Sequence, residues 1–212
     1  MTINVQDFMT RIALDLHESD NSFPTGCWTP DEMLGFLNYA EQEFLQRTGI
    51  MKSDDSIVLP PASPILVDRP DNTMDIERIS FNGKYLRRQT SWDLEKGDPS
   101  WRANSIGNPH FWHEDHISNK QIELDKIPTA GGTVRIFADT YPNPYVSSLE
   151  DIHIKDSWEI YLRWKVLALA LAKDGQGQDL GRSQYADRRF SFGIYLARRI
   201  ILGVGRLIVP EM

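Results

Sequence analysis

Three histidines, a glutamate and an aspartate lie within the stretch HFWHEDH at 110–116. Imidazole and carboxylate groups are ligands for zinc, so the stretch raises the question of a metal site. The zinc-protease pattern needs two histidines four residues apart on a helix, whereas HEDH spaces them three apart. The surrounding pattern predicts a strand, which puts His110 and His116 on one face and His113 on the other. We therefore expect a solvated edge strand, and a metal site only if another strand supplies further ligands.

Cys27 is the only cysteine, and it directly precedes a predicted helix. A thiolate is stabilised at a helix N-terminus, and the stretch TGCW resembles the corresponding part of papain-like enzymes. His153 would be the partner base, but the position expected to hold an asparagine is Asp156, and no glutamine shortly upstream of Cys27 supplies an oxyanion hole. We expect Cys27 to behave as a small buried apolar residue. A cysteine- or metal-dependent hydrolase, built on Cys27 or on 110–116, is the alternative enzymatic function.

The stretch GQGQDLG at 175–181 resembles a phosphate-binding loop, but its third glycine comes one position late. It also follows a predicted helix, whereas a dinucleotide-binding motif follows a strand. We interpret the stretch as a connection between helices. The sequence therefore predicts no cofactor and no catalytic residues.

The composition is that of a packed globular protein: 212 residues, 41% of them hydrophobic, with six tryptophans. The formal net charge is −7, whereas a protein that grips nucleic acid needs a basic surface. The charge is uneven, with a net +2 from residue 150 onward and −9 before it. The longest apolar run, VLALALA, is too short to span a membrane. The single cysteine and the absence of signal-peptide features predict a soluble protein made in a reducing, intracellular compartment.

Two helices are predicted within 4–48. Asn4 is placed to cap the first helix. The stretch TPDE at 29–32 marks the start of the second, with Thr29 as the N-cap and Glu32 as the returning acid of a capping box. Gly49 then supplies a left-handed stop. Apolar residues recur at helical spacing in both segments, so each helix is expected to bury one face.

An antiparallel β region is predicted at about 56–142. Its strongest signal is Asn82-Gly83 between IERISF and KYLRRQ, because a type I′ hairpin turn needs positive φ at both central residues. The segments IVLPP and ILVDRP are proline-bounded and suit edge strands, and HFWHEDHI, QIELDKI and TVRIFADTY are further candidates. Short connections favour antiparallel neighbours, so we expect a small sandwich or partly closed barrel.

Two long helices are predicted within 151–199. The first is apolar on two sides, with one stripe made of Trp158, Leu162, Leu169 and Ala172, and a second made of Ile160, Trp164, Leu167 and Leu171. A helix that is apolar on two faces must be covered on both, and we expect the second stripe to contact a neighbouring subunit. From Ile200 onward, Gly203 and Gly205 disfavour a helix, which leaves an extended tail at 200–212.

The predicted fold class is therefore α+β, with an N-terminal helix pair, a small antiparallel sheet region and two long C-terminal helices. We expect one domain over 1–199, in which helices at 4–48 and 151–199 flank the β region. The tail at 200–212 follows it.

The order of these features resembles the head-to-tail adaptor (connector) proteins of tailed bacteriophages over roughly residues 5–200. The resemblance begins in WTPDEMLGFLNYAEQEFL and continues through the Asn-Gly hairpin. The positions that carry it are Trp28, Leu37, Asn38, Ala40, Trp101, Pro109, Trp112, Ile122, Leu124, Pro128, the stretch 139–142 and SQYADRRF.

This resemblance implies a structural virion protein without catalysis, found in the neck and, during assembly, in the host cytoplasm. It implies a closed homo-oligomeric ring, commonly a dodecamer, beneath the portal protein and above a tail or nozzle protein. Genomic DNA would pass through the ring, and an acidic chain suits a channel in which DNA does not bind. Alternatives are a tail-tube or tail-completion protein and a stable acidic monomer.

The resemblance also implies a docking function for the tail, because adaptors of this family contact the portal partly through C-terminal segments. The residues concerned combine apolar side chains with arginines that can pair with an acidic surface. They are Arg198, Arg199, Ile201, Leu202, Arg206, Leu207, Ile208 and Val209.

Overall fold

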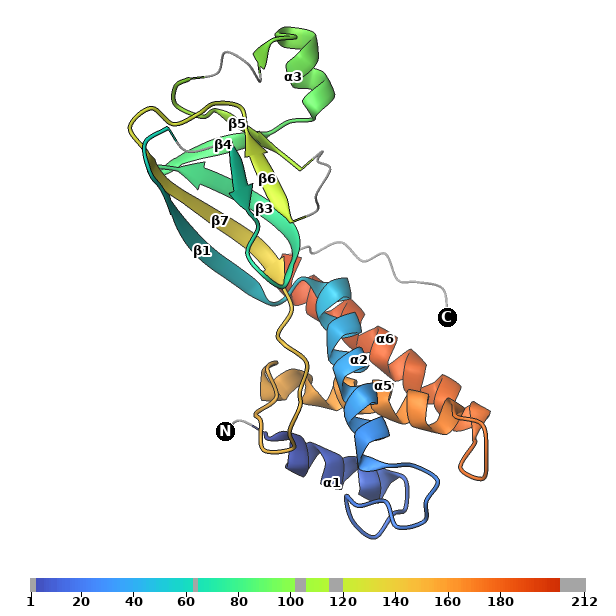
Figure 1. The fold of residues 1–212 in the computed structure, drawn as a ribbon. Helices are drawn as coiled ribbons and strands as arrows, with labels where there is room; N and C mark the ends of the chain where they lie inside the picture. The colour runs from blue at the N-terminus through green and yellow to red at the C-terminus, as the bar shows by residue number, and fades with distance from the viewer. Residues whose placement is uncertain (1–2, 63–64, 102–105, 115–119, 203–212) are drawn as a thin grey trace. The chain divides into compact units, whose positions relative to one another are not determined.

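The computed structural model describes residues 3–62, 65–101, 106–114 and 120–202, without the side chain of Leu202. The chain forms two compact units: a helical unit, Met1–Met51 with Tyr141–Met212, and a β unit, Lys52–Thr140 (Figure 1). Helices predicted at the two ends of the sequence thus share one unit. The α+β class expected from the sequence is confirmed.

The helical unit contains α1 (Val5–Asp15), α2 (Pro30–Thr48), α5 (Asp156–Ala172) and α6 (Leu180–Leu202). The predicted caps are confirmed: the Asn4 side chain accepts from the Asp7 amide, and Thr29 and Glu32 form a capping box. Gly49 ends α2 with φ 60°. Each helix contributes fully buried side chains to a common core, among them Phe8, Ile12, Met33, Leu37, Phe44, Leu162, Val166, Phe190 and Ala197.

Both C-terminal helices differ in extent from the prediction. The first was expected to begin at 151, but α5 begins at Asp156, because Ile152 donates its amide to the Ile3 carbonyl at 2.9 Å in an extended conformation. The second was expected to end at Arg199, but α6 continues to Leu202. Ile201 is half-buried and lines a hollow with Leu45 and Trp158, and this packing outweighs the weak helix propensity of the β-branched residues.

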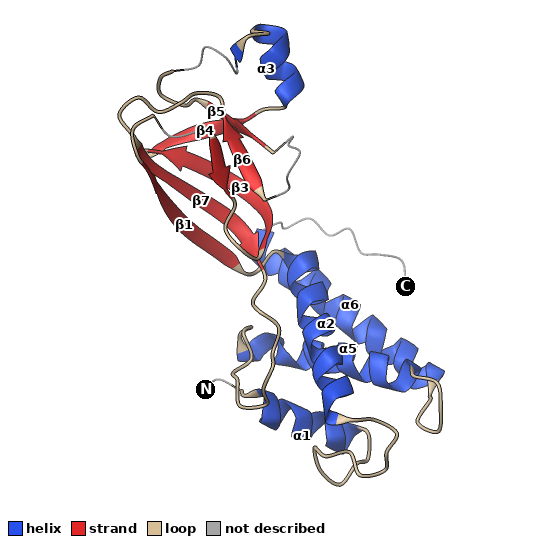
Figure 2. Ribbon diagram, in the orientation of Figure 1, coloured by secondary structure: helices blue, strands red, loops and turns tan. Residues whose placement is uncertain are grey.

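The β unit is one curled sheet of seven strands that forms a half-barrel (Figure 2). The order is β1-β7-β3-β4-β5-β6-β2. The strands are β1 (Lys52–Leu59), β2 (Leu66–Asp68), β3 (Thr73–Phe81), β4 (Lys84–Arg88), β5 (Phe111–His113), β6 (Gln121–Leu124) and β7 (Gly132–Thr140). The sheet therefore begins at Lys52 rather than at about 56.

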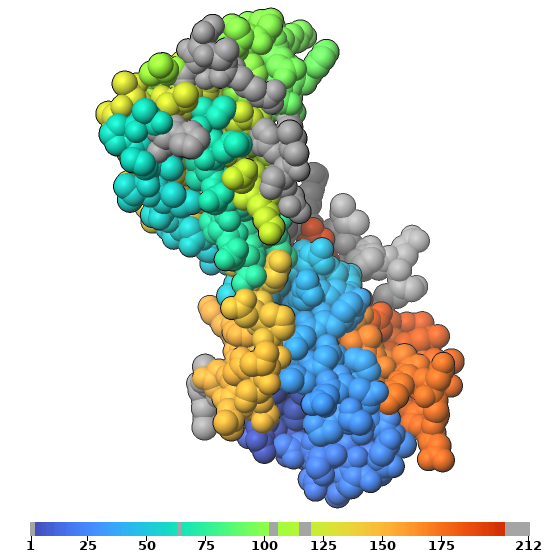
Figure 3. All heavy atoms as spheres, viewed as in Figure 1, coloured from blue at the N-terminus to red at the C-terminus, as the bar shows by residue number. Residues whose placement is uncertain are grey.

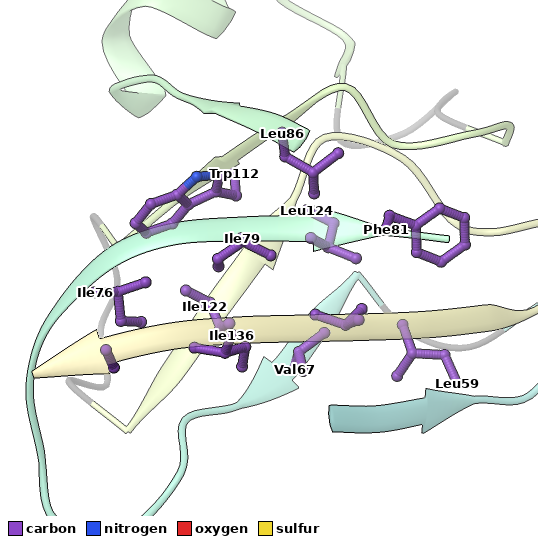
Figure 4. Close-up of a cluster of buried hydrophobic side chains, with 12 residues drawn as sticks. Leu59, Val67, Ile76, Ile79, Phe81, Leu86, Trp112, Ile122, Leu124 and Ile136 are labelled. Carbon is purple, nitrogen blue, oxygen red and sulfur yellow. The ribbon is translucent and has the colours of Figure 1, made fainter. Parts of the chain in front are cut away.

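The inner face of the sheet holds the core of the β unit. Figure 4 shows side chains from all seven strands directed into one cluster. Its members are Leu59, Val67, Ile76, Ile79, Phe81, Leu86, Trp112, Ile122, Leu124, Val134, Ile136 and Ala138. The curl of the sheet allows one face to enclose this apolar volume.

The local turn prediction is confirmed and one pairing prediction is wrong. Asn82 and Gly83 have φ of 47° and 79°, as the predicted hairpin between β3 and β4 requires. We expected only antiparallel neighbours, but β4 and β5 pair in parallel. The segment that joins them includes a helix that was not predicted, α3 (Ser91–Gly97), and this longer route lets β5 run in the same direction as β4.

Gly193 sets the close approach of α5 and α6. A Cβ at this position would overlap the ring of Tyr161. We predict that Gly193→Ala lowers the free energy of unfolding by about 1–3 kcal/mol, because the ring cannot move without separating the two helices. Chemical denaturation at equilibrium measures the change.

Gly35 of α2 is the matched control, because a Cβ there meets nothing within 4 Å. Gly35→Ala should raise the free energy of unfolding by about 0.5–1 kcal/mol through helix propensity. Equal effects of the two substitutions would contradict the close-packing role of Gly193.

Candidate functional site

Helix α5 contacts the three other helices of its unit. Arg163 binds Asp15 of α1 through two hydrogen bonds of 2.6 and 3.1 Å. Trp158 meets Phe44 of α2 with ring centroids 6.0 Å apart. On the α6 side, the Ser183 hydroxyl donates to the carbonyl of Ala168 at 2.8 Å. These contacts cover most sides of α5 and leave only part of its circumference exposed.

Ile160 and Trp164 occupy the uncovered part of α5. Ile160 follows Trp158 by two residues, which turns it about 200° around the helix axis, away from α2. Its side chain is 37% exposed, and Trp164, one turn later, is half-buried. The surface predicted on this side of α5 is thus present at these two positions.

Helix α6 extends this surface with aromatic side chains. The ring of Tyr185 meets Trp164 edge-on, with centroids 5.8 Å apart, and is 55% exposed. The Arg189 guanidinium lies 5.8 Å from the centre of the Trp164 ring. Phe192, one turn after Arg189, is 50% exposed. We call the set Ile160, Trp164, Tyr185, Arg189 and Phe192 the aromatic face.

The composition of the aromatic face is that of a protein–protein contact. Trp, Tyr, Phe and Arg are enriched at the centres of interfaces, where they supply most of the binding energy. The side chains project from two helices that cross closely at Gly193, so the surface is largely ordered before a partner binds.

The predicted subunit contact at Leu167 and Leu171 needs correction. Both side chains are only 4% exposed within the chain itself. The chain turns back over this end of α5, since the Asp179 amide donates to the Leu171 carbonyl at 2.9 Å. The two leucines therefore pack inside their own unit and leave little surface for a neighbour.

Tyr185, Arg189 and Phe192 were not identified as site residues from the sequence. They lie at i, i+4 and i+7 within SQYADRRFSF, a spacing that aligns them on one side of a helix. That signal was available, but it does not say which side of α6 is covered. Only the packing of α6 on α5 decides this.

Charge is divided between the elements of the helical unit. Helix α6 carries five arginines and one aspartate, a net +4, whereas residues 3–51 carry eight acidic residues and two arginines, a net −6. Lys165 of α5 links α2 to α6, because it forms ion pairs of 2.9 Å with Glu43 of α2 and with Asp187 of α6. Burial opposes its charge, but the hydrogen bonds to these carboxylates raise the pKa of Lys165 above its usual value.

The prediction of a solvated edge strand at 110–116 is wrong for the residues that the structure describes. β5 spans only Phe111–His113 and lies between β4 and β6. Trp112 enters the core, and His113 is 1% exposed, with Nε2 3.1 Å from Glu123. His116 lies outside the described residues. Within those ranges, no three His, Cys, Asp or Glu side chains are grouped to hold a metal ion.

The two other motifs considered in the sequence, the stretch around Cys27 and the glycine-rich stretch at 175–181, pack against each other. Gly177, in the connection between α5 and α6, lies so close to Trp28 that a Cβ would come within 2.6 Å of the indole. Cys27 is partly exposed rather than buried as expected, and its carbonyl accepts a hydrogen bond from Lys173 at 2.9 Å. His153 instead binds Glu41 of α2 at 3.0 Å. The stretch at 175–181 is therefore confirmed as a helix connection, except that Leu180 and Gly181 already belong to α6.

The predicted docking tail is described only in part. Arg198 and Arg199 are exposed on α6, Ile201 is half-buried, and Leu202 ends the helix. The other predicted residues, Arg206, Leu207, Ile208 and Val209, lie outside the described residues. In the part of the chain that is described, no helix combines the length and apolar character needed to cross a membrane.

A comparison with protein-family models matches residues 3–200 to the family described as SU10 adaptor protein. The matched range includes the whole β unit, most of the helical unit and the whole aromatic face. A comparison with curated proteins finds no match.

The exposed surface of Trp164 yields a test of the aromatic face. We predict that Trp164→Ala weakens self-association by about 2 kcal/mol, because an indole at the centre of a contact contributes strongly, while the monomer stays folded. Sedimentation over a dilution series measures association, and thermal unfolding measures the fold. Trp92→Ala, which removes a 72% exposed indole from α3, should change neither. If the Trp164→Ala protein associates normally but has a much lower melting temperature, Trp164 is part of the core and not of a subunit contact.

Proposed function

The chain belongs to the SU10 adaptor protein family, and on this premise we propose that it is the head-to-tail adaptor of a tailed phage, a ring of identical subunits beneath the portal. The family is one of structural phage proteins and not of enzymes, which sets aside the hydrolase alternative. It also implies a location in the virion neck. The match over residues 3–200 is the observation that carries the proposal.

The aromatic face supports ring formation. A ring closes when each subunit presents two different surfaces, one of which binds the other surface of the next copy. The aromatic face supplies one such surface, and its arginine-rich helix suits a partner surface of negative charge. The acidic residues of 3–51 belong to the same unit and provide that charge on every copy. Electrostatic complementarity of this kind fixes orientation and speeds association.

The tail at 200–212 is proposed to contact the portal. α6 runs to Leu202, so the segment beyond it starts from the end of a packed helix with Arg198 and Arg199 exposed nearby. These arginines can pair with carboxylates on a partner, and the apolar residues that follow in the sequence can add buried surface. The proposed docking segment thus consists of the last residues of α6 and residues 203–212.

Deletion of residues 203–212 tests portal docking. We predict a protein that stays folded, as judged by far-UV circular dichroism, because α6 stays intact, but that no longer co-assembles with the portal protein of the same phage. Electron microscopy of the two purified proteins, mixed at equal subunit ratio, shows whether a ring is seated on the portal. A truncated protein that docks like the full chain would refute the role of the tail, and a full chain that forms no ring with the portal would refute the adaptor proposal.

A passive channel predicts weak DNA binding. The 23 Lys and Arg side chains are outnumbered by 30 Asp and Glu, so the chain as a whole repels a phosphate backbone. We expect no retention of duplex DNA in filter binding at about 50 mM salt and protein concentrations up to about 10 µM, a concentration within the range of about 1–100 µM that is typical of non-specific dissociation constants. Submicromolar affinity at physiological salt would contradict the passive channel.

A further inference from the structure

The segment that returns from the β unit is fixed by one buried carboxylate on α2. Glu41 is 3% exposed, accepts a hydrogen bond from the Tyr145 hydroxyl at 2.6 Å and lies 3.0 Å from Nδ1 of His153. The two rings stack with centroids 4.5 Å apart, and the His153 amide donates to the Tyr145 hydroxyl at 2.9 Å. Burial and the Glu41 carboxylate raise the pKa of Tyr145, so its hydroxyl remains a donor. We call residues 145–153 the clasped loop.

The inside of the clasped loop is also hydrogen-bonded. The Glu150 carboxylate accepts from the amides of Val146 and Ser147 at 3.0 and 2.7 Å. The Leu149 amide donates to the Ser147 hydroxyl at 3.2 Å. The backbone is tied to α1 as well, because Val5 and Gln6 donate to the carbonyls of residues 150 and 148 at 2.8 and 2.9 Å. Hydrogen bonds thus hold the loop backbone both internally and against α1.

In this conformation the apolar side chains of Val146 and Leu149 are exposed to solvent. Val146 is 86% and Leu149 is 83% exposed, the highest values among the large apolar residues that the structure describes. A loop that needed only to connect β7 to α5 would gain nothing from them. Side chains presented on an ordered backbone lose little further entropy on binding, which is the property of a prepared contact.

The clasped loop and the aromatic face belong to opposite sides of the helical unit. Tyr145 exchanges two backbone hydrogen bonds with the Asn38 side chain, at 2.7 and 3.1 Å, which places the loop on α2. In Figure 3, the segment 141–155 lies beside α2 on the face toward the viewer. Ile160 of the aromatic face, by contrast, projects from α5 away from α2.

We propose that Val146 and Leu149 of one copy pack on the aromatic face of a second copy, so that the clasped loop is the other half of the lateral contact. The inference rests on the proposed ring. Two different surfaces on opposite sides of one unit make a head-to-tail contact, which repeats from copy to copy until it closes.

The charges around the two surfaces favour this pairing. The loop carries Glu150 and exposed Asp151 and is packed on the acidic segment 3–51. The aromatic face contains Arg189, flanked on α6 by exposed Arg188, and α6 has a net charge of +4. Two copies meeting loop to face therefore attract each other, whereas two aromatic faces would repel. The charges therefore favour contact between the loop of one copy and the aromatic face of another over contact between two aromatic faces.

Two single substitutions test the contact by complementation. Leu149→Asp puts a charge into the loop, and Phe192→Asp puts one into the aromatic face. Each should weaken self-association by on the order of a hundredfold, since an apolar contact is lost and a carboxylate is desolvated. An equimolar mixture retains one intact loop and one intact face. It should form a 1:1 dimer that cannot grow further, visible by sedimentation and native mass spectrometry.

Val58→Asp is the matched control, because Val58 is 77% exposed on β1 of the β unit and should leave association unchanged. Thermal unfolding of all three variants verifies that the exposed substitutions preserve the fold. Normal association of Leu149→Asp with loss in Phe192→Asp would overturn the role of the loop while keeping the ring. Two monomeric variants that fail to form the mixed dimer would overturn the head-to-tail pairing. A wild-type chain that stays monomeric with and without portal protein would overturn both proposals.

Discussion

The helical unit is assembled from two stretches that are separated in the sequence by the β unit, and a buried carboxylate on α2 ties the second stretch to the first. Glu41 binds both Tyr145 and His153, so both ends of the returning segment are held by one side chain. The Trp28 indole adds a second link by donating to the Ala170 carbonyl at 2.9 Å. Ordering such a distant segment costs chain entropy, which the shared core of the helical unit must offset.

The contacts of Glu41 with Tyr145 and His153 help determine which surfaces of the helical unit are exposed. With the returning segment fixed on α2, α5 enters the core at a defined angle, and α6 crosses it where Gly193 meets Tyr161. The contacts that hold α5 then leave Ile160 and Trp164 uncovered beside Tyr185. The same fixation holds Val146 and Leu149 in solvent. A single buried polar cluster therefore influences two surfaces on opposite sides of the unit.

Features encoded by neighbouring residues were predictable from the sequence. The Thr29–Glu32 capping box and the Asn82-Gly83 turn depend on residues within one turn, and both are as expected. The burial of His113 and the parallel pairing of β4 with β5 depend on segments far away in the sequence, and both were missed. The sequence also could not show that α6 continues to Leu202, because packing overrides propensity there.

The candidate site shows the same division. Periodicity identified an apolar side of α5 but could not tell Ile160 and Trp164, which stay at the surface, from Leu167 and Leu171, which the chain itself covers. The clasped loop was not identified, because the Glu41 carboxylate that fixes it on α2 lies more than a hundred residues earlier in the sequence. Which side chains stay exposed depends on how distant segments pack, so a local sequence pattern does not predict the surface.

The pairing of the first and last strands of the β unit has an evolutionary consequence. β1 and β7 are antiparallel neighbours with Lys52 opposite Asp139, so the chain enters and leaves this unit at adjacent points. A module whose two junctions adjoin can be enlarged, shortened or exchanged without stretching the scaffold into which it is inserted. The junctions at Lys52 and Thr140 are therefore compatible with changes in the size of the β unit that leave the helical unit intact.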